Sequence, residues 1–232
     1  MTIFVKNKQI VVPGTLIAEG NYNVVGPCIK EGTRYYATTV SLVEFKENGI
    51  KLTPLSGIYF PKVGDLVIGK IIEVTPVGWF VDINSPYRAF LALKEGVNEF
   101  VDITRTDISK YYDEGEYILC KVINVSKRGI VHVSTKETKF RKIKEGLIIS
   151  ITPSKVPRVI GKGGSMVKMI KEITGAQVIV GQNGRVWIKA ENPEIETLVA
   201  QAIQMIDKAS HISGLTEKVK RFLEENIKNI KK

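Results

Sequence analysis

Residues 159–164 read Val159-Ile160-Gly161-Lys162-Gly163-Gly164, and Thr174-Gly175-Ala176 follows further along the chain. A Gly-x-x-Gly turn between two helical segments has no Cβ atoms that would keep a nucleic-acid backbone at a distance. The next helix would point free N–H groups and its positive end toward a phosphate, and Lys162 adds a mobile cation. In the alternative interpretation the glycines only end one helix and open another. The basic residue inside the turn and the Thr-Gly-Ala stop favour the binding turn.

The spacing beyond the turn resembles that of KH domains. Val167-Lys168, Ile170 and Thr174-Gly175-Ala176 match the run I-K-x-[IL]-x-x-x-[ST]-G-A of that family. The resemblance covers residues 146–210 and implies a groove for about four single-stranded nucleotides. The residues that it implies for RNA binding are Val159, Ile160, Gly161, Lys162, Gly163, Gly164, Lys168 and Ile170, with Val167 and Val178 as further apolar lining.

The elements expected in this region follow the order of a type I KH domain. A strand at 147–151, a short helix at 153–159 and a longer helix at 165–174 come first. A hairpin of 178–180 and 186–188 follows, in which Asn183-Gly184 is a strong turn signal. A helix then runs from Pro193 to about residue 209 with one apolar face. Trp187 is expected to pack rather than to hold a base.

The charge of the chain is strongly positive and unevenly distributed. Its 232 residues carry a formal net charge of +10, and residues 146–232 hold fourteen Lys and Arg against eight Asp and Glu. This excess predicts a polyanionic partner or an acidic protein surface. A basic surface that only maintains solubility is the alternative. RNA binding at physiological salt would separate an RNA-binding protein from an adaptor for acidic proteins.

Two β-rich regions precede the KH-like region. Residues 1–60 alternate short β-branched runs with glycine turns, which predicts a small all-β docking or scaffolding domain. Residues 61–145 predict strands at 66–74, 78–83, 87–93, 117–125 and 130–135, an order that fits a five-stranded OB-type barrel. The fold class is therefore multidomain and mainly β, with an α+β module and a C-terminal helix.

The barrel region resembles the S1-type RNA-binding domain. The matching runs are Val63-Gly64-Asp65, Gly69-Lys70-Ile71 and Gly78-Trp79-Phe80-Val81-Asp82. In that family two aromatic residues and a histidine contact bases, but Val77 and Ala92 stand at two of these positions here. Because neighbours in a strand face opposite sides, one of Trp79 and Phe80 is core and the other can stack on a base. The barrel candidates for RNA binding are Lys70, Trp79, Phe80 and Arg128.

The tail at 211–232 is a basic amphipathic helix with Val219, Phe222, Leu223, Ile227 and Ile230 on its apolar side. The preferred interpretation is an intramolecular strut that covers the KH domain, and the alternative is a helix that docks on a partner subunit. Cys28 and Cys120 are too few for a disulfide framework or a zinc ribbon, and both are expected to be small buried apolar residues.

No pattern in the chain fits nucleophilic, acid–base or metal-ion catalysis, so we expect a non-enzyme with no cofactor and no metal. An acidic cluster in the connection between barrel strands is expected to be a solvated loop; it comprises Asp102, Asp107, Asp113, Glu114 and Glu116. The start of the sequence has no signal-peptide core, and no run of about 18 apolar residues could span a bilayer. We therefore expect a cytoplasmic protein with no membrane contact.

The domain order supplies the most specific resemblance. A β-rich N-terminal unit with Val11-Val12-Pro13-Gly14, an S1-type barrel and one KH domain resemble the RNA-binding cap subunit of the archaeal exosome. Thr15 stands where that family commonly has an acidic residue. The resemblance implies three copies on a ring of RNase PH-like subunits, which receive single-stranded RNA 3′ ends through a pore. The alternative is a free-standing S1/KH regulator of transcription or translation.

Overall fold

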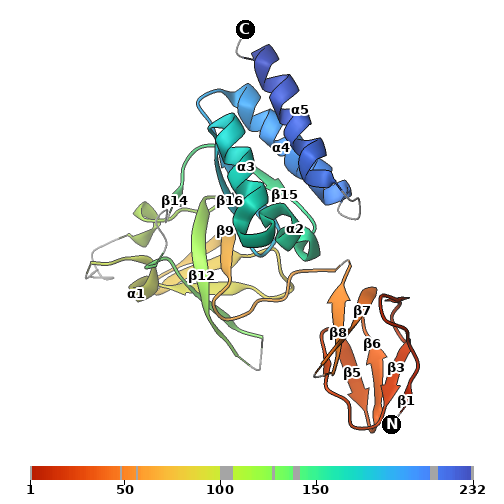
Figure 1. Ribbon diagram of the computed structural model, residues 1–232. Coiled ribbons are helices and arrows are strands. Elements are labelled where there is room, and N and C mark those ends of the chain that lie inside the picture. Colours follow the sequence, from red (N-terminus) through yellow and green to blue (C-terminus); the bar gives the residue numbers. More distant parts are fainter. Residues whose placement is uncertain are drawn as a thin grey trace. The chain divides into compact units, whose positions relative to one another are not determined.

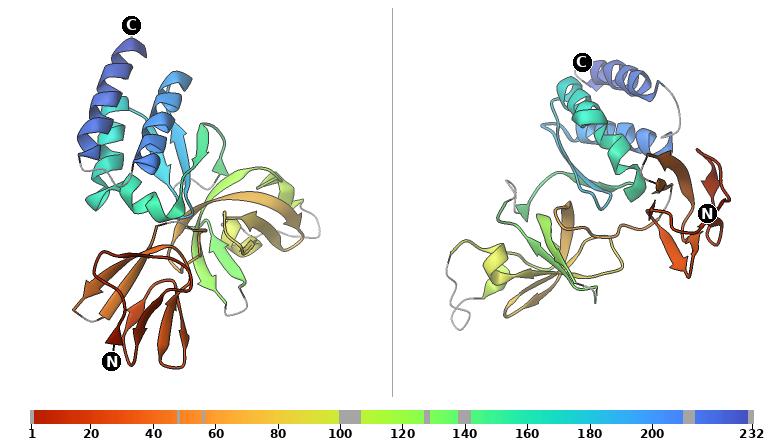
Figure 2. Two further views of the ribbon diagram at one scale, coloured as in Figure 1. Left: turned by 90° about the vertical axis from the view of Figure 1, so that its right-hand side faces the viewer. Right: turned by 60° about the horizontal axis from the view of Figure 1, so that its bottom comes forward.

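The computed structural model describes residues 2–47, 49–55, 57–99, 107–126, 129–137, 142–209 and 214–230. The chain divides into two compact units, Met1–Gly57 and Ile58–Lys232. Both are shown in Figures 1 and 2. The predicted fold class, mainly β with an α+β module, is confirmed. None of the described helices is long and apolar enough to cross a membrane.

The first unit contains two four-stranded sheets, which confirms the predicted small β domain. Their orders are β1-β3-β6-β5 and β2-β7-β8-β4. Val11, Ile17, Val43 and Leu52 lie in the core between them. Cys28 is only half-buried, so the expectation of a buried thiol is wrong at that position. The strands are β1 Thr2–Ile3, β2 Ile10–Val11, β3 Leu16–Glu19, β4 Val24–Val25, β5 Cys28–Glu31, β6 Arg34–Ala37, β7 Ser41–Lys46 and β8 Gly49–Pro54.

The second unit begins with a closed barrel, as predicted. The sheet runs β13-β11-β10-β9-β12-β14, and an additional β12–β13 pairing closes five of its strands into a ring. The β11–β13 pair is parallel and the other pairs are antiparallel. The elements are β9 Leu66–Thr75, β10 Gly78–Asp82, β11 Ala89–Ala92, α1 Leu93–Gly96, η1 Ile108–Lys110, β12 Tyr117–Val125, β13 Val131–Ser134 and β14 Lys142–Ile143.

The barrel core settles which of the two adjacent aromatic residues of β10 faces inward. Trp79 is fully buried, and its ring meets Tyr112 edge-on with the centroids 5.1 Å apart. Its indole Nε1 donates a hydrogen bond to the carbonyl oxygen of Tyr112 at 2.8 Å, so the buried polar group is satisfied. Trp79 is therefore a core residue, and its predicted RNA contact is wrong. Phe80 lies on the opposite face and is half-buried.

The KH region has the predicted order of elements. Its sheet runs β15-β17-β16 with antiparallel pairs. Asn192 caps the following helix by accepting a hydrogen bond from the Glu194 N–H at 2.9 Å. The elements are β15 Leu147–Ser150, η2 Pro153–Lys155, α2 Val156–Ile160, η3 Lys162–Gly164, α3 Ser165–Thr174, β16 Gln177–Val180, β17 Arg185–Lys189, α4 Pro193–Lys208 and α5 Leu215–Ile230.

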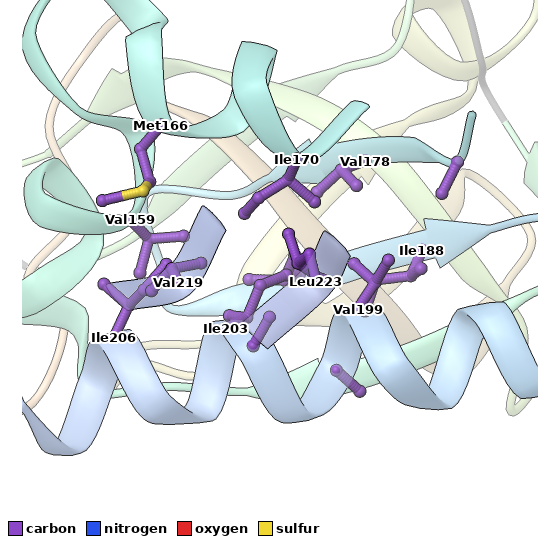
Figure 3. Packing of buried hydrophobic residues seen from close by; sticks show 14 of the residues in the cluster. Val159, Met166, Ile170, Val178, Ile188, Val199, Ile203, Ile206, Val219 and Leu223 are labelled. Carbon is purple, nitrogen blue, oxygen red and sulfur yellow. The ribbon is translucent and has the colours of Figure 1, made fainter. Parts of the chain in front are cut away.

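The C-terminal helix α5 is part of the KH core. It packs against α3 and α4, as the views of the ribbon show (Figures 1 and 2). Its Val219 and Leu223 are fully buried and lie among Ile203, Ile206 and Ile170 (Figure 3). The intramolecular strut is therefore the correct interpretation of the apolar side of this helix, because that side is already occupied within the chain.

The barrel and the KH domain share an interface within the second unit. Ile68 and Leu119 of the barrel form a buried cluster with Trp187 of β17. The indole Nε1 of Trp187 donates to the carbonyl oxygen of Glu145 at 2.6 Å. Trp187 packs, as predicted, but it packs between the two domains rather than inside the KH core.

Candidate nucleic-acid interface

The glycine turn has the geometry that a backbone-binding loop needs. Gly163 and Gly164 have φ values of 62° and 82°, in the left-handed region that glycine adopts at little cost. A Cβ added at either position would meet no atom within 4 Å, so the outer side of the turn is open space. Gly164 directly precedes α3, so the positive end of the helix dipole lies at this turn, although the N–H of Ser165 is already bonded to the Lys162 carbonyl oxygen.

An apolar groove lies beside this turn. It has a volume of about 330 Å³ and is lined by Ile160, Gly164, Val167, Lys168, Lys171 and Val180. One wall comes from α3 and the other from β16. Branched apolar side chains can contact the faces of many bases, whereas the two lysines favour a phosphate or an acceptor-rich base edge. Lys171 and Val180 were missed in the sequence. Lys171 lies three positions after Lys168 on α3, and this helical spacing is a signal that could have identified it.

The structure separates the predicted groove residues into three groups. Ile160, Gly164, Val167 and Lys168 line the groove. Gly161, Lys162 and Gly163 form the adjacent turn, and Lys162 and Gly163 are exposed. Val159, Ile170 and Val178 do not belong to the lining, because each is at most 2% exposed and lies in the hydrophobic core (Figure 3). These three side chains shape the groove from below, so their predicted direct contact with bases is wrong.

The rim of the groove is cationic. Lys162, Lys168 and Lys171 are exposed on the turn and along α3. Lys168 pairs with Glu172 at 3.8 Å, but both side chains are more than 60% exposed, so this pair is weak and can reorganise. A single-stranded RNA that crosses the glycine turn would therefore have its phosphates on the positively charged side of the groove.

A second groove lies on the outer face of the barrel. Its volume is about 690 Å³, and aromatic side chains dominate its lining. Tyr87 lies directly against Gly129, because a Cβ at position 129 would come within 2.7 Å of the Tyr87 ring. The lining residues are Thr75, Val77, Phe80, Pro86, Tyr87, Arg88, Phe90, Gly129, Ile130 and His132.

Strand register builds the aromatic row in this groove. Phe80 pairs with Phe90 across β10 and β11, and Phe90 pairs with His132 across β11 and β13. Their ring centroids are 5.3 Å and 6.2 Å apart, respectively. Phe60, which is 54% exposed, extends the row with its centroid 6.5 Å from that of Tyr87. Exposed rings of this kind provide stacking platforms for bases of any sequence.

Lys70, another barrel candidate, does not line this groove. Lys70 lies over the ring of Tyr117, 5.9 Å from its centroid. Its RNA contact stays a prediction. Arg128 lies outside the described residues. Within the described ranges, no group of three or more His, Cys, Asp or Glu side chains could hold a metal ion.

Three family models match successive parts of the chain. The model described as the N-terminal domain of the exosome RNA-binding protein RRP4 matches residues 8–56. The RRP4 S1 domain model matches residues 58–124, and a KH domain model matches residues 146–194. The three matches follow the same order as the β unit, the barrel and the KH domain.

Relatives with known names match almost the whole chain. The exosome complex component Rrp4 of Pyrococcus furiosus is 46% identical over 231 residues, which cover 99% of this chain and 88% of the relative. The Rrp4 component of Thermofilum pendens is 38% identical over 99% of this chain and 98% of its own length. A crystal structure provisionally described as an exosome complex RNA-binding protein is 36% identical, with a TM-score of 0.70. That match covers 76% of this chain and all of the other.

Proposed function

The chain belongs to the Rrp4 family of exosome complex components, and we propose that it is the RNA-binding cap subunit of an archaeal exosome. In this function it captures single-stranded RNA and guides 3′ ends to a phosphorolytic ring of RNase PH-like subunits. The observation that carries the proposal is the full-length match to named Rrp4 components, combined with two grooves suited to a single strand. We assign the cleavage chemistry to the ring and none to this chain.

The two grooves bind different parts of the RNA. The glycine turn at Gly161–Gly164 and the lysines beside it hold the sugar-phosphate backbone, while Ile160, Val167 and Val180 contact base faces. On the barrel, Phe80, Phe90 and Tyr87 stack on further bases. Neither surface reads base edges at many positions, so the expected binding tolerates many sequences. Such tolerance suits a protein that delivers RNA for degradation.

We assign a separate role to each part of the chain. Residues 1–60 dock on the ring, residues 61–145 and 146–210 bind RNA, and residues 211–232 complete the KH domain. Exposed apolar side chains on the first unit support its docking role. Among them, Ile10 is 60% exposed, Val12 57% and Ile29 52%. Contiguous exposed apolar patches are typical of protein interfaces, so these side chains are our candidates for the docking face.

Reconstitution with the RNase PH-like ring tests the proposal. The full chain is mixed with the ring, and the mass of the co-eluting complex is measured by light scattering. We expect three copies for each ring and faster degradation of a single-stranded RNA than by the ring alone. If the chain binds RNA but neither associates with the ring nor changes the degradation rate, the protein is a free RNA-binding regulator instead.

A further inference from the structure

The turn of the KH hairpin is inserted into the barrel. Asn183 is fully buried, although the sequence indicates only a surface Asn-Gly turn. Its side-chain Oδ1 accepts a hydrogen bond from the Ile68 N–H at 3.3 Å. Its Nδ2 donates to the carbonyl oxygens of Ile68 and Ile83 at 2.8 and 2.9 Å. The backbone oxygen of Asn183 also accepts from Asn84 Nδ2 at 2.8 Å.

The side-chain amide of Asn183 makes hydrogen bonds to β9 that a neighbouring β-strand would otherwise make. β10 ends at Asp82, which pairs with Lys70 of β9, so the backbone of Ile68 lies beyond the end of that pairing. Asn183 bonds both the N–H and the carbonyl oxygen of Ile68, as a neighbouring strand would. The backbone N–H of Gln182 adds a bond to the Leu66 carbonyl oxygen at 2.8 Å. The KH hairpin thus continues the barrel sheet.

Arg185 fixes the same junction from the first residue of β17. Its side chain is 11% exposed and forms an ion pair with the Asp82 carboxylate. Its Nη1 also donates to the Asp82 and Ile68 carbonyl oxygens, at 2.7 and 3.2 Å. A nearly buried guanidinium with this many partners gives a directional contact, unlike an exposed ion pair. Asn183 and Arg185, with their partners Ile68, Ile83 and Asp82, are called the clamp below.

The clamp is adjacent to both grooves along the chain. Val180 lines the KH groove, and Gln182, two residues later, is bonded to the barrel. Phe80 lines the barrel groove, and Asp82, two residues later, is bonded to Arg185. Two extended residues span only about 7 Å, so each groove wall is tied to the clamp over a short distance.

We propose that Asn183 and Arg185 are positioning residues that hold the KH groove and the barrel groove as one bivalent site for a single RNA strand. The proposal rests on the proposed RNA binding by both grooves. A rigid connection makes the second contact intramolecular, so a strand that reaches both grooves gains affinity over one that reaches a single groove. The KH groove takes about four nucleotides and an OB-type barrel at least about four, so the gain requires roughly eight nucleotides or more.

The test compares RNA lengths in the full chain. Uridine oligonucleotides of 4, 8, 12 and 16 nucleotides are titrated against the wild type and the double variant Asn183→Leu/Arg185→Lys, which keeps the net charge. The matched control is Gln177→Leu/Lys189→Arg, because these two residues pair at the far end of the same hairpin. NMR relaxation measures the relative motion of the barrel and the KH domain in each variant. If the double variant does not fold, the single variant Arg185→Lys replaces it in the same titrations.

We expect the wild type and the control to bind the longest RNA about 100-fold or more tighter than the tetramer, within the range for linked sites. In the clamp variant this gain should fall at least about tenfold, while tetramer affinity stays within about twofold and the two domains tumble separately. If affinity increases with RNA length by the same factor in the wild type and the clamp variant, the bivalent site is refuted but the proposed function stands. If the wild type binds no RNA of any length, the proposed function fails, and the bivalent site fails with it.

Discussion

Replacing Lys162 and Gly163 with aspartates should weaken RNA binding without unfolding the KH domain. Both residues are exposed, and a side chain at position 163 meets no atom within 4 Å. The φ of 62° at Gly163 lies in the left-handed region that aspartate tolerates, at a cost of about 1 kcal/mol. The double variant Lys162→Asp/Gly163→Asp should therefore keep its circular dichroism spectrum and lose only slight thermal stability.

The loss of affinity follows from the change in charge. The variant removes one positive charge and adds two negative ones beside the expected phosphates. Each unit charge about 5 Å from a phosphate contributes about 0.8 kcal/mol in water, so three contribute about 2.5 kcal/mol. Screening at physiological salt roughly halves this value. Binding should weaken about 60-fold at low salt and about tenfold at 0.15 M salt.

Fluorescence anisotropy with a labelled single-stranded RNA measures this effect across a series of salt concentrations. The slope of log affinity against log salt should become shallower by about 0.7 for the lost lysine contact alone. The matched control is Lys30→Asp/Gly32→Asp, which makes the same charge change at another exposed glycine turn, with φ of 58°. If the KH variant and this control bind equally well with equal salt slopes, the glycine turn does not bind the RNA backbone.

Four further predictions concern stability, RNA binding and the dependence of stability on pH. Trp79→Ala should lower the free energy of unfolding by about 3–5 kcal/mol in urea titrations, because the ring is fully buried. Phe80→Ala should instead weaken RNA binding about 5- to 150-fold in anisotropy titrations, and equal RNA affinities of the two variants would contradict this division. Leu223→Ala should destabilise the KH domain by about 2–5 kcal/mol in urea, whereas exposed Lys218→Ala should change stability by no more than about 0.5 kcal/mol. Partial burial alone would raise the pKa of Glu116, but bonds from Lys142 at 2.6 Å and the Asp113 N–H lower it on balance. The ionised carboxylate thus stabilises the fold above its ordinary pKa of 4.5, and this contribution is lost as the pH falls through the lowered value. Glu116→Gln should flatten the acid side of a stability-against-pH curve from urea melts, and an unchanged curve would contradict the role of this ion pair.

The sequence predicts the elements of this protein well because local signals mark their ends. Glycines and Asn183-Gly184 mark the turns, and the apolar face that follows Pro193 identifies α4. The spacing that resembles KH domains predicts α3, whose bounds match the predicted range. Which side chains of an element line the groove and which lie in the core is harder to predict from the sequence. Val159 and Ile160 are neighbours in α2, yet only Ile160 reaches the groove. Adjacent helical positions differ by about 100° in direction, so the sequence alone does not distinguish them.

Contacts between distant strands explain the remaining differences. Phe90 and His132 join Phe80 only through the registers of β10, β11 and β13, which no local pattern in the sequence reveals. Asn183 is a turn signal by composition, but its buried amide bonds depend on the free backbone of Ile68 in another domain. The candidate site was therefore predictable at the glycine turn and not at the aromatic row of the barrel.

The position of α5 has a consequence for synthesis of the protein. Leu215, Val219, Leu223 and Ile227 complete a hydrophobic core whose other members end with α4 at Lys208. Because α5 is synthesised last, the nascent KH domain has an uncovered apolar face until this helix has emerged and docked. Until α5 docks, the growing polypeptide is a target for chaperones and proteases.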